Sequence, residues 1–389
     1  MRKIKRILAF MLVLSIAFTN LACGGAKALS KGSGAANGET VSFKSLEKES
    51  SMEVTYAKNF SVDYYKGGFT LITIDSNDHR FLMVPEGVAT PTDLDKDIVA
   101  IQKPLDNIYL VAVAAMTFFD TLDAVDTVKF SGAKEDGWYV DSAKKAMQEG
   151  KIKYAGKYSE PDYETLISQK ARLSIQSGMI MHSPDVQEKL EELGIPVLID
   201  RSSYETHPLG RSEWIKLYGV LLGKDKEAEE FFAKQAKVMD ELKDIKPLNK
   251  KVAYFYINSN GAVVTRKTSD YIPKMIQIAG GTYAFEQLGD DDTATSSVTM
   301  ELEEFYKTAK DADYIIYNST IAGELETIDQ LVAKNQLLKN IKAVKDGNVW
   351  ASDKNVYQST GQFGDIIGEM HKLLTDDTSG EFKHFYKLK

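Results

Sequence analysis

The amino-acid sequence predicts an α/β fold with two lobes, built on mainly parallel sheets and joined by a long helix. Segments with strand and helix patterns alternate from about residue 54 to residue 199. A helical stretch follows from Leu209 to Leu242, with apolar residues recurring at intervals of three and four. The alternation then resumes at Val252 and continues toward the C-terminus. Strands that alternate with helices indicate parallel βαβ units, and the break between two such series indicates two lobes.

Length and charge narrow the possible functions. A chain of 389 residues exceeds one ordinary hydrophobic core and favours two domains. The hydrophobic content of 43% is that of a folded protein rather than a disordered one. The formal net charge is −8, and residues 1–22 contribute basic residues but no acid, so the remainder is more acidic still. Such a charge repels phosphate backbones, and nucleic acid is not an expected partner.

The N-terminus has the pattern of an export signal. Basic residues between Arg2 and Arg6 precede a short apolar run from Ile7 to Phe18, which predicts a signal peptide over residues 1–22. The only cysteine, Cys23, follows Leu21 and Ala22 in a segment that resembles a bacterial lipobox. That resemblance implies lipidation of Cys23 and anchoring at the extracytoplasmic face of the cell membrane. An alternative is ordinary cleavage after residues 26–28, which would release a secreted product.

Domain boundaries follow changes in composition. Residues 23–50 are rich in Gly, Ser and Ala and predict a flexible, lipid-anchored tether. We expect an N-terminal lobe over 51–208, opened by a hairpin of 69–74 and 80–84. A linker helix is expected over 209–246, and a C-terminal lobe over 247–389. At 1.5 Å per residue the helical stretch is roughly 50 Å long, as one helix or as two end to end.

Both halves contain a glutamate at a predicted helix start, about ten residues before an apolar strand. Glu164 precedes the strand at 173–176, and Glu303 precedes the strand at 314–317. A carboxylate near a helix N-terminus is stabilised by the helix dipole. Without further information this pattern indicates helix capping that needs no partner.

Four segments of the chain carry a further resemblance. The first lobe has Asp162-Tyr163-Glu164 followed by residues 170–175. The other three segments are residues 300–316, 201–215 and 343–350, the last reading Ala-Val-Lys-Asp-Gly-Asn-Val-Trp. Together they resemble one family, the ABC-transporter solute-binding lipoproteins for iron-siderophores, haem and cobalamin (class III periplasmic binding proteins), although Ala171 and Arg172 replace the family's Pro and Asp.

The resemblance implies two Rossmann-like lobes, a rigid linker helix and a ligand held between the lobes. It also implies that Glu164 and Glu303 dock onto arginines of an ABC permease dimer with its ATPase, with Glu301 and Glu304 as alternatives to Glu303. The expected ligand is a metal chelate, namely a ferric siderophore, haem or cobalamin. The protein itself is expected to need no cofactor and to act as a monomer.

Ligand-binding residues are expected in loops after the carboxyl ends of the strands, where open α/β sheets bind ligands. Aromatic and methionine side chains suit a flat, apolar ligand, and an arginine suits a carboxylate. The candidates are Met116, Thr117, Trp138, Tyr139, Met179, Met181, His182, Asn258, Arg266, Tyr271, Asn318 and Gln358.

Other chemistry is less well supported by the sequence. Met179, Met181, His182 or Tyr204 could supply an axial ligand to haem. The five histidines are scattered, so direct capture of a metal ion is not predicted. Nucleophile elbows, zinc-protease motifs and phosphate-binding loops are missing from the sequence, so no catalytic residue is predicted. Two alternatives stay open: an exported enzyme on the same scaffold, such as a hydrolase or chelatase, and a surface lipoprotein without a ligand.

Overall fold

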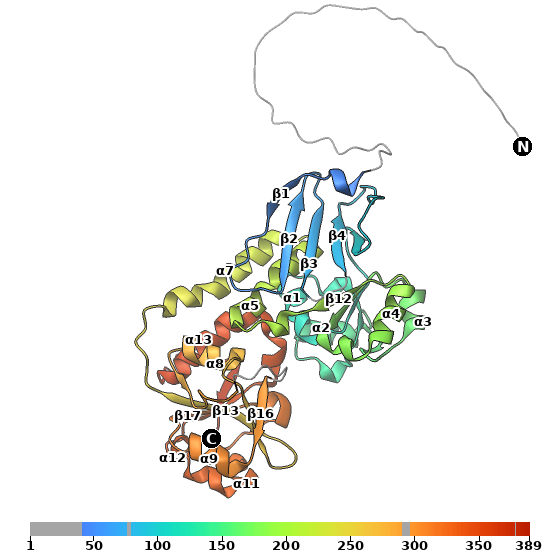
Figure 1. Ribbon diagram of the computed structural model, residues 1–389. Coiled ribbons are helices and arrows are strands. Elements are labelled where there is room, and N and C mark those ends of the chain that lie inside the picture. Colours follow the sequence, from blue (N-terminus) through green and yellow to red (C-terminus); the bar gives the residue numbers. More distant parts are fainter. Residues whose placement is uncertain (1–40, 76–78, 290–295, 378) are drawn as a thin grey trace, which may run out of the picture. The chain divides into compact units, whose positions relative to one another are not determined.

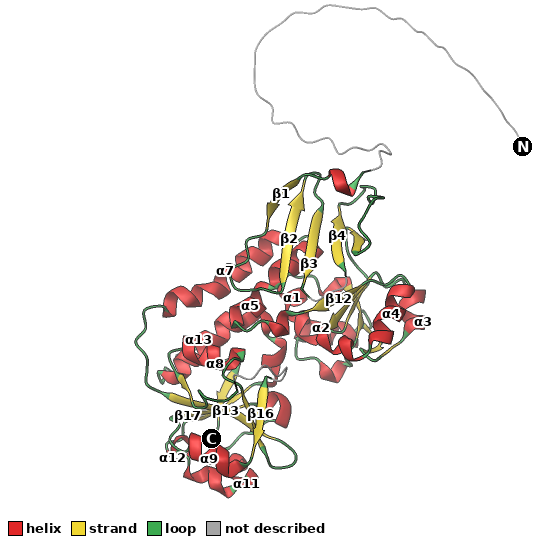
Figure 2. Ribbon diagram, in the orientation of Figure 1, coloured by secondary structure: helices red, strands yellow, loops and turns green. Residues whose placement is uncertain are grey.

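Strands and helices alternate along most of the chain, as the sequence predicts (Figures 1 and 2). The computed structural model describes residues 41–75, 79–289, 296–377 and 379–389. The expected signal peptide, Cys23 and most of the expected tether lie outside these ranges. Within them, no helix is both long enough and apolar enough to cross a membrane.

The strands are β1 (Lys48–Ser51), β2 (Phe60–Tyr65), β3 (Thr70–Ile74), β4 (Arg80–Val84), β5 (Ile98–Gln102), β6 (Ile108–Leu110), β7 (Val128–Ser131), β8 (Lys153–Tyr154), β9 (Gly156–Lys157), β10 (Glu160–Pro161), β11 (Leu173–Ser177), β12 (Val197–Asp200), β13 (Lys251–Ile257), β14 (Val263–Arg266), β15 (Thr282–Tyr283), β16 (Ser297–Met300), β17 (Tyr314–Tyr317), β18 (Val349–Ser352) and β19 (Phe385–Lys387). The α-helices are α1 (Met116–Thr121), α2 (Asp141–Gln148), α3 (Tyr163–Ser168), α4 (Pro184–Glu192), α5 (Pro208–Glu213), α6 (Ile215–Leu222), α7 (Asp225–Leu242), α8 (Tyr271–Ile278), α9 (Leu302–Ala309), α10 (Ser319–Ala322), α11 (Ile328–Lys334), α12 (Lys342–Lys345) and α13 (Phe363–Leu374).

The N-terminal lobe contains two five-stranded sheets. The first has the order β1-β2-β3-β4-β5 and is antiparallel except between β4 and β5. Pairing of β3 with β4 confirms the predicted hairpin. The second sheet has the order β12-β11-β6-β7-β8 and is parallel throughout, as the βα alternation predicts. Its strands therefore all end at the same edge, which is where the loops of the candidate site begin.

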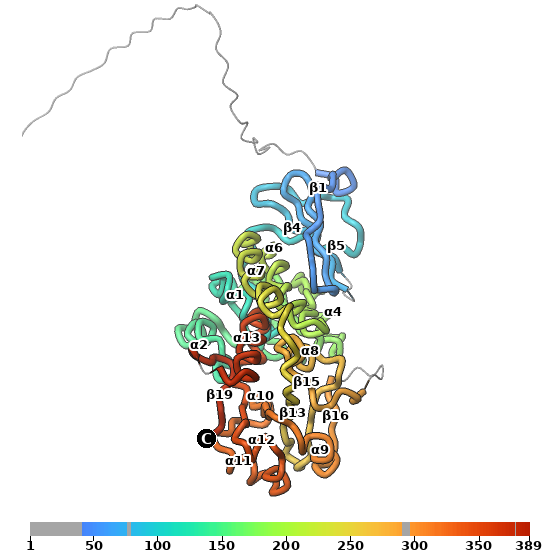
Figure 3. Tube along the Cα trace, turned by 90° about the vertical axis from the view of Figure 1, so that its left-hand side faces the viewer, coloured from blue at the N-terminus to red at the C-terminus, as the bar shows by residue number. Residues whose placement is uncertain are grey.

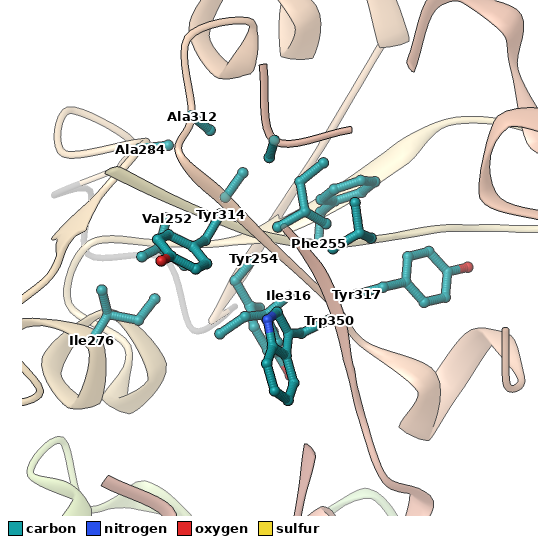
Figure 4. Close-up of a cluster of buried hydrophobic side chains, with 14 of the residues drawn as sticks. Val252, Tyr254, Phe255, Ile276, Ala284, Ala312, Tyr314, Ile316, Tyr317 and Trp350 are labelled. Atoms are coloured by element: carbon teal, nitrogen blue, oxygen red, sulfur yellow. The ribbon is translucent and has the colours of Figure 1, made fainter. Parts of the chain in front are cut away.

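The C-terminal lobe is built on a mixed sheet of the order β16-β14-β13-β17-β18-β19, with β15 beside β13. β13, β15, β17 and β18 are parallel, while β14, β16 and β19 are antiparallel to their neighbours. Helices α8 and α13 lie on one side of the sheet, and α9, α11 and α12 lie on the other (Figures 1 and 3). Side chains of β13, β17 and β18 form the middle of this core, including Phe255, Ile316 and Trp350 (Figure 4).

The helical region between the lobes differs from the predicted continuous element. Helix α6 ends at Gly223, whose φ of 68° lies in the left-handed region that glycine adopts without steric cost. Helix α7 then packs against α6 instead of extending it. The prediction of one helix, or of two helices end to end, is therefore wrong for residues 209–222.

Helix α7 is the element that connects the two hydrophobic cores. Phe232 belongs to the core of the N-terminal lobe, whereas Val238 belongs to the core of the C-terminal lobe. The first part of the predicted linker, α5 and α6, contributes Trp214 and Tyr218 to the N-terminal core. With 18 residues, α7 is about 27 Å long, roughly half of the predicted length.

Candidate functional site

A pocket of about 400 Å³ lies between the two lobes. Its volume falls within the range of roughly 300–1,000 Å³ that is typical of small-molecule sites. The N-terminal lobe contributes residues that follow β11 and β12, and the C-terminal lobe contributes the segment that starts α8. The lining residues are Ser177, Gly178, Met179, Ser203, Tyr204, Glu205, Thr206, Arg211, Ser269, Asp270, Tyr271 and Ser296.

The pocket wall after β12 is held by Asp200, the last residue of that strand. Its Oδ1 accepts hydrogen bonds from the Ser202 N–H (3.0 Å) and the Ser202 hydroxyl (2.5 Å), and its Oδ2 accepts one from the Tyr218 hydroxyl (2.6 Å). Burial raises the pKa of Asp200, and the hydrogen bonds from Ser202 and Tyr218 partly offset that effect. The carboxyl group thereby fixes the turn from which Arg201 and Tyr204 extend.

Arg211, from α5, spans the junction between the lobes. Its guanidinium lies 3.7 Å from the ring centroid of Tyr271 in the C-terminal lobe, a cation–π contact. On its own lobe it donates from Nε to the carbonyl of Glu205 (2.9 Å) and from Nη2 to the carbonyl of Ser203 (2.6 Å). Burial lowers the pKa of Arg211, but an arginine stays protonated in a protein. The pocket therefore contains a fixed positive charge.

The opposite wall starts with Asp270, which caps helix α8 by accepting a hydrogen bond from the Ile272 N–H at 3.0 Å. This cap fixes Tyr271 as the first residue of the helix. Arg266 lies beside Asp270, with Nη1 and Oδ2 3.8 Å apart, and also donates to the Ser296 hydroxyl (3.1 Å). Burial raises the pKa of Asp270, and the neighbouring Arg266 partly offsets that increase.

A third arginine, Arg201, lies next to the pocket. Its guanidinium stacks 3.7 Å above the ring centroid of Tyr204, and its Nη1 lies 3.6 Å from the sulfur of Met181. Among the described residues no carboxylate forms an ion pair with Arg201. Arg201, Arg211 and Arg266 thus surround a pocket whose acidic lining residues, within the part of the chain that the structure describes, are Asp270 and Glu205.

The lobes also meet directly on another side of the junction. The buried side chain of Gln358 accepts a hydrogen bond from the Tyr139 N–H (2.8 Å) and donates one to the Gly137 carbonyl (2.8 Å). The rings of Tyr139 and Tyr357 pack edge to face with centroids 5.9 Å apart. A smaller polar pocket of about 220 Å³ lies here and includes Thr117.

Eight of the twelve predicted ligand-binding residues fall into three groups in the structure. Met179 and Tyr271 line the larger pocket, and Arg266 is joined to it through Asp270. Met181 and His182 are exposed on the turn Gly178–His182, beside Met179. Thr117, Tyr139 and Gln358 meet at the smaller pocket.

Four of the predicted residues are not brought to either pocket. Met116 and Trp138 are buried in the core of the N-terminal lobe, and the Trp138 indole donates to the Ser131 hydroxyl at 3.2 Å. Asn258 caps the turn between β13 and β14. Asn318 is buried and caps α10 through Thr320. These side chains pack in the core or cap local turns. The expectation that ligands bind in loops after strand ends does not distinguish such residues from ligand contacts.

Sequence reasoning missed Arg201 and Arg211 as site residues. The sequence prediction places residues 201–208 in the N-terminal lobe and 209–211 in the linker helix, and it nominates none of them for ligand binding, although the segment directly follows β12. The rule that nominated the loops after the other strands therefore applies to it as well. Arg201 and Tyr204 in this loop, and Arg211 in the helix that follows it, were the available signal.

Glu164 and Glu303 are both exposed, on α3 and α9 respectively, and neither lines a pocket between the lobes. Helix α3 is capped by Asp162, whose carboxylate accepts a hydrogen bond from the Thr165 N–H at 3.0 Å. The side chain of Glu164 is therefore not the cap of its helix. Glu301 and Glu304, the alternatives to Glu303, are exposed as well.

Among the described residues, no group of three or more His, Cys, Asp and Glu side chains is arranged to hold a metal ion. The acidic run at 290–292 lies outside the described ranges, as does Cys23. Three of the four candidate haem ligands are close to the site, because Met179 and Tyr204 line the pocket and Met181 contacts Arg201, while His182 is exposed on the turn that follows Met181.

Comparison with protein families identifies the fold. Residues 111–356 match the model of the periplasmic binding protein family, which is more than half of the chain. The chain belongs to the periplasmic binding proteins. The matched segment begins directly after β6 and contains every lining residue of the larger pocket, whereas the smaller pocket is also lined by residues 358, 359 and 362, which lie beyond the match.

Individual relatives agree with this assignment. An uncharacterized lipoprotein of Methanocaldococcus jannaschii, MJ0878, is 25% identical over 372 residues, covering 87% of this chain and 86% of the relative. A putative ABC transporter substrate-binding lipoprotein of Bacillus subtilis, YhfQ, is 26% identical over 162 residues, covering 39% of this chain and 49% of the relative. Lipoproteins and substrate-binding proteins thus recur among the relatives of this periplasmic binding protein.

Solved structures share the fold at low sequence identity. The triscatecholate siderophore binding protein FeuA of Bacillus subtilis has a TM-score of 0.55 at 18% identity, covering 72% of this chain and 95% of FeuA. The haem binding protein HutB of Vibrio cholerae has a TM-score of 0.54 at 15% identity, covering 68% and 98%. These matches confirm the predicted two-lobed α/β architecture.

Proposed function

We propose that this periplasmic binding protein captures an anionic metal chelate outside the cytoplasm and delivers it to an ABC importer. The observation that carries the proposal is the arginine-rich pocket between the lobes. Arg211 and Arg201 stack on Tyr271 and Tyr204, and no carboxylate of the described residues lies within ion-pair distance of either guanidinium. Arginine donors suit the carboxylate or catecholate oxygens of a ferric siderophore.

The remaining lining favours binding over catalysis. The aliphatic hydroxyls of the pocket come from Ser177, Ser203, Thr206, Ser269 and Ser296, and its described lining residues include no histidine or cysteine. A serine nucleophile needs a base within hydrogen-bond reach. Tyr204, Tyr271 and Met179 instead offer apolar surface against an aromatic or flat ligand. These features support a receptor more than the alternative of an exported enzyme.

A thermal-shift panel tests the ligand class. The candidates are ferric tris-catecholate, ferric citrate, ferric hydroxamate, haemin and cobalamin. A ligand that binds only the folded state adds about 2.7 kcal/mol at a hundredfold excess over Kd, so the correct chelate raises Tm clearly. We expect the catecholate or citrate complex to do so. Stabilisation by cobalamin or hydroxamate alone would contradict the proposed charge of the ligand.

Membrane attachment through Cys23 is the second part of the proposal. It is supported by the lipobox-like segment and by the lipoproteins among the relatives. Two acyl chains give stable anchoring, whereas one gives only marginal binding. We expect Cys23→Ala to move the protein from the membrane fraction to the soluble or secreted fraction. A variant that stays with the membranes to the same extent as the wild type would overturn this part.

A further inference from the structure

Five consecutive backbone N–H groups, of residues 55–59, donate to two buried carboxylates. Thr55, Tyr56 and Ala57 donate to Glu213, and residues 58 and 59 donate to Glu205, at distances of 2.6–3.0 Å. The donors precede β2, while the acceptors lie roughly 150 residues later, with Glu205 just before α5 and Glu213 at its last position. The two glutamates thereby hold the N-terminal segment against the junction between the lobes.

The two carboxylates are satisfied in different ways. Both are buried, and a buried charge is costly unless it is paired or hydrogen-bonded. Glu213 has Lys216 as a counterion, with Oε1 and Nζ 3.4 Å apart. Glu205 has no ion pair among the described residues, and its further donor is the buried indole N–H of Trp214, at 3.0 Å. Glu205 therefore depends on N–H groups from the N-terminal segment and from Trp214.

Only one of the two glutamates belongs to the ligand pocket. Glu205 lines it together with Ser203, Tyr204 and Thr206, whereas Glu213 does not. The main chain of the same loop is also held from the other side, because Arg211 donates to the carbonyls of residues 203 and 205. Loop 202–206 is thus fixed between Arg211 and the N-terminal segment.

We infer that Glu205 is a positioning residue, which uses the N-terminal segment 58–59 to hold loop 202–206 and Arg211 in the geometry that receives the ligand. This rests on the proposed function only in the identity of the bound species. The segment that leads from the tether is, on this view, a structural part of the binding site. Glu213 provides a matched control, because it accepts N–H groups of the same N-terminal segment but does not line the pocket.

Hydrogen exchange of the ligand-free protein is the main test, with Glu205→Gln and Glu213→Gln compared. In the loop the amides of residues 204 and 205 are bonded to the carbonyls of 201 and 202 and serve as reporters. We expect Glu205→Gln to speed their exchange at least tenfold. Glu213→Gln should speed exchange at 55–57 but change the loop amides less than twofold. Equal effects of the two variants on the loop, or none, would overturn the inference.

Binding of ferric tris(2,3-dihydroxybenzoate) is the second readout. We expect Glu205→Gln to weaken it at least tenfold, and Glu213→Gln to leave its Kd within twofold at a temperature where both variants are folded. If the wild type does not bind this probe, the proposed ligand class fails, while the exchange result still decides the role of Glu205. If Glu205→Gln does not fold, Trp214→Phe removes one donor to Glu205, and the same loop amides should exchange faster. Unchanged exchange in that variant contradicts the inference.

Discussion

The role of Arg211 in the pocket depends on contacts that sequence patterns do not reveal. Its charge is unremarkable in a chain with 48 basic residues. Its role depends on Tyr271, sixty residues later, which lies under the guanidinium, and on carbonyls of its own lobe. The same limitation explains why Met116 and Trp138 are predicted for the site but lie in the core. A side chain that follows a strand can point toward the site or toward the core, and the sequence does not specify which.

Replacing Arg211 separates geometry from charge. Arg211→Lys keeps the charge but loses the planar stack and the fork of donors, which are not interchangeable with an ammonium group. Removing a hydrogen bond to a charged group costs about 1.5–3 kcal/mol, so we expect ligand affinity to fall roughly 10- to 100-fold. Calorimetric titration with the chelate selected by the thermal-shift panel measures it. Arg80→Lys is the control, since Arg80 pairs with Asp97 outside the pocket, and its affinity should match the wild type.

We expect the stability of the folded protein to depend on pH through His207. Its Nδ1 accepts the Leu209 N–H at 3.2 Å and so caps α5, which requires a ring without a proton on that nitrogen. Burial lowers the pKa of His207, and Lys274 and Lys58 lower it further while Glu213 opposes them. Because the folded-state pKa lies below the unfolded value near 6.5, the contribution of His207 is present above that pH and is lost as the pH falls toward the folded-state pKa.

The measurement compares the wild type with His207→Asn between pH 7.5 and 5. Asparagine also caps helices but does not titrate, so the variant should lose less stability on acidification. The difference should reach about 1 kcal/mol, the usual value of a cap. Parallel curves of unfolding free energy against pH for the two proteins would show that His207 is not responsible.

At the level of elements, periodicity was a good guide to the existence of helices and a poor guide to their path. The apolar spacing of residues 209–242 is helical, and the structure confirms helices there. It cannot show that the chain reverses at Gly223, because a glycine is compatible with a continued helix as well as with a left-handed turn. The path is decided by packing, in which α6 joins the N-terminal core and α7 crosses to α13.

The contact between α7 and α13 depends on Gly364. A Cβ atom at this position would lie 2.2 Å from the main-chain oxygen of Gln235 in α7. We expect Gly364→Ala to destabilise the protein by about 1–3 kcal/mol, as overpacking does, because backbone cannot move aside cheaply. Gly368→Ala, on the same helix with open space around it, should stabilise by about 0.5–1 kcal/mol. Urea unfolding of both variants measures this, and two shifts of the same sign would contradict it.

For the whole molecule, the sequence supported the two-lobed fold but not the places where the lobes touch. Strand and helix patterns are local, whereas the hydrogen bonds of Gln358 to residues 137 and 139 join positions more than two hundred residues apart. A further long-range hydrogen bond runs from the Ser212 hydroxyl to the Thr360 carbonyl, at 2.9 Å. Such contacts arise from side chains that fit across an interface, and no periodic pattern encodes them.

Docking onto a permease is expected to be separable from ligand binding, because Glu164 and Glu303 are exposed and line neither pocket between the lobes. Glu164→Lys combined with Glu303→Lys places cations in the first turns of α3 and α9, at a cost of about 0.3–1 kcal/mol each, so the fold should survive. Losing charge pairs with permease arginines should cost about 2–5 kcal/mol each. We therefore expect chelate uptake to collapse while the Kd stays within a few-fold.

The control for docking reverses the same number of charges elsewhere. Glu49→Lys with Glu86→Lys changes two exposed glutamates in the N-terminal sheet and in the turn after β4, and uptake should stay near that of the wild type. Uptake by cells and affinity of the purified protein are measured on the same variants. Normal uptake in the Glu164 and Glu303 double variant would remove both residues from the docking surface. A loss of affinity in that variant would instead assign both residues to the ligand site, because residues used only for docking should not affect ligand binding in the pocket.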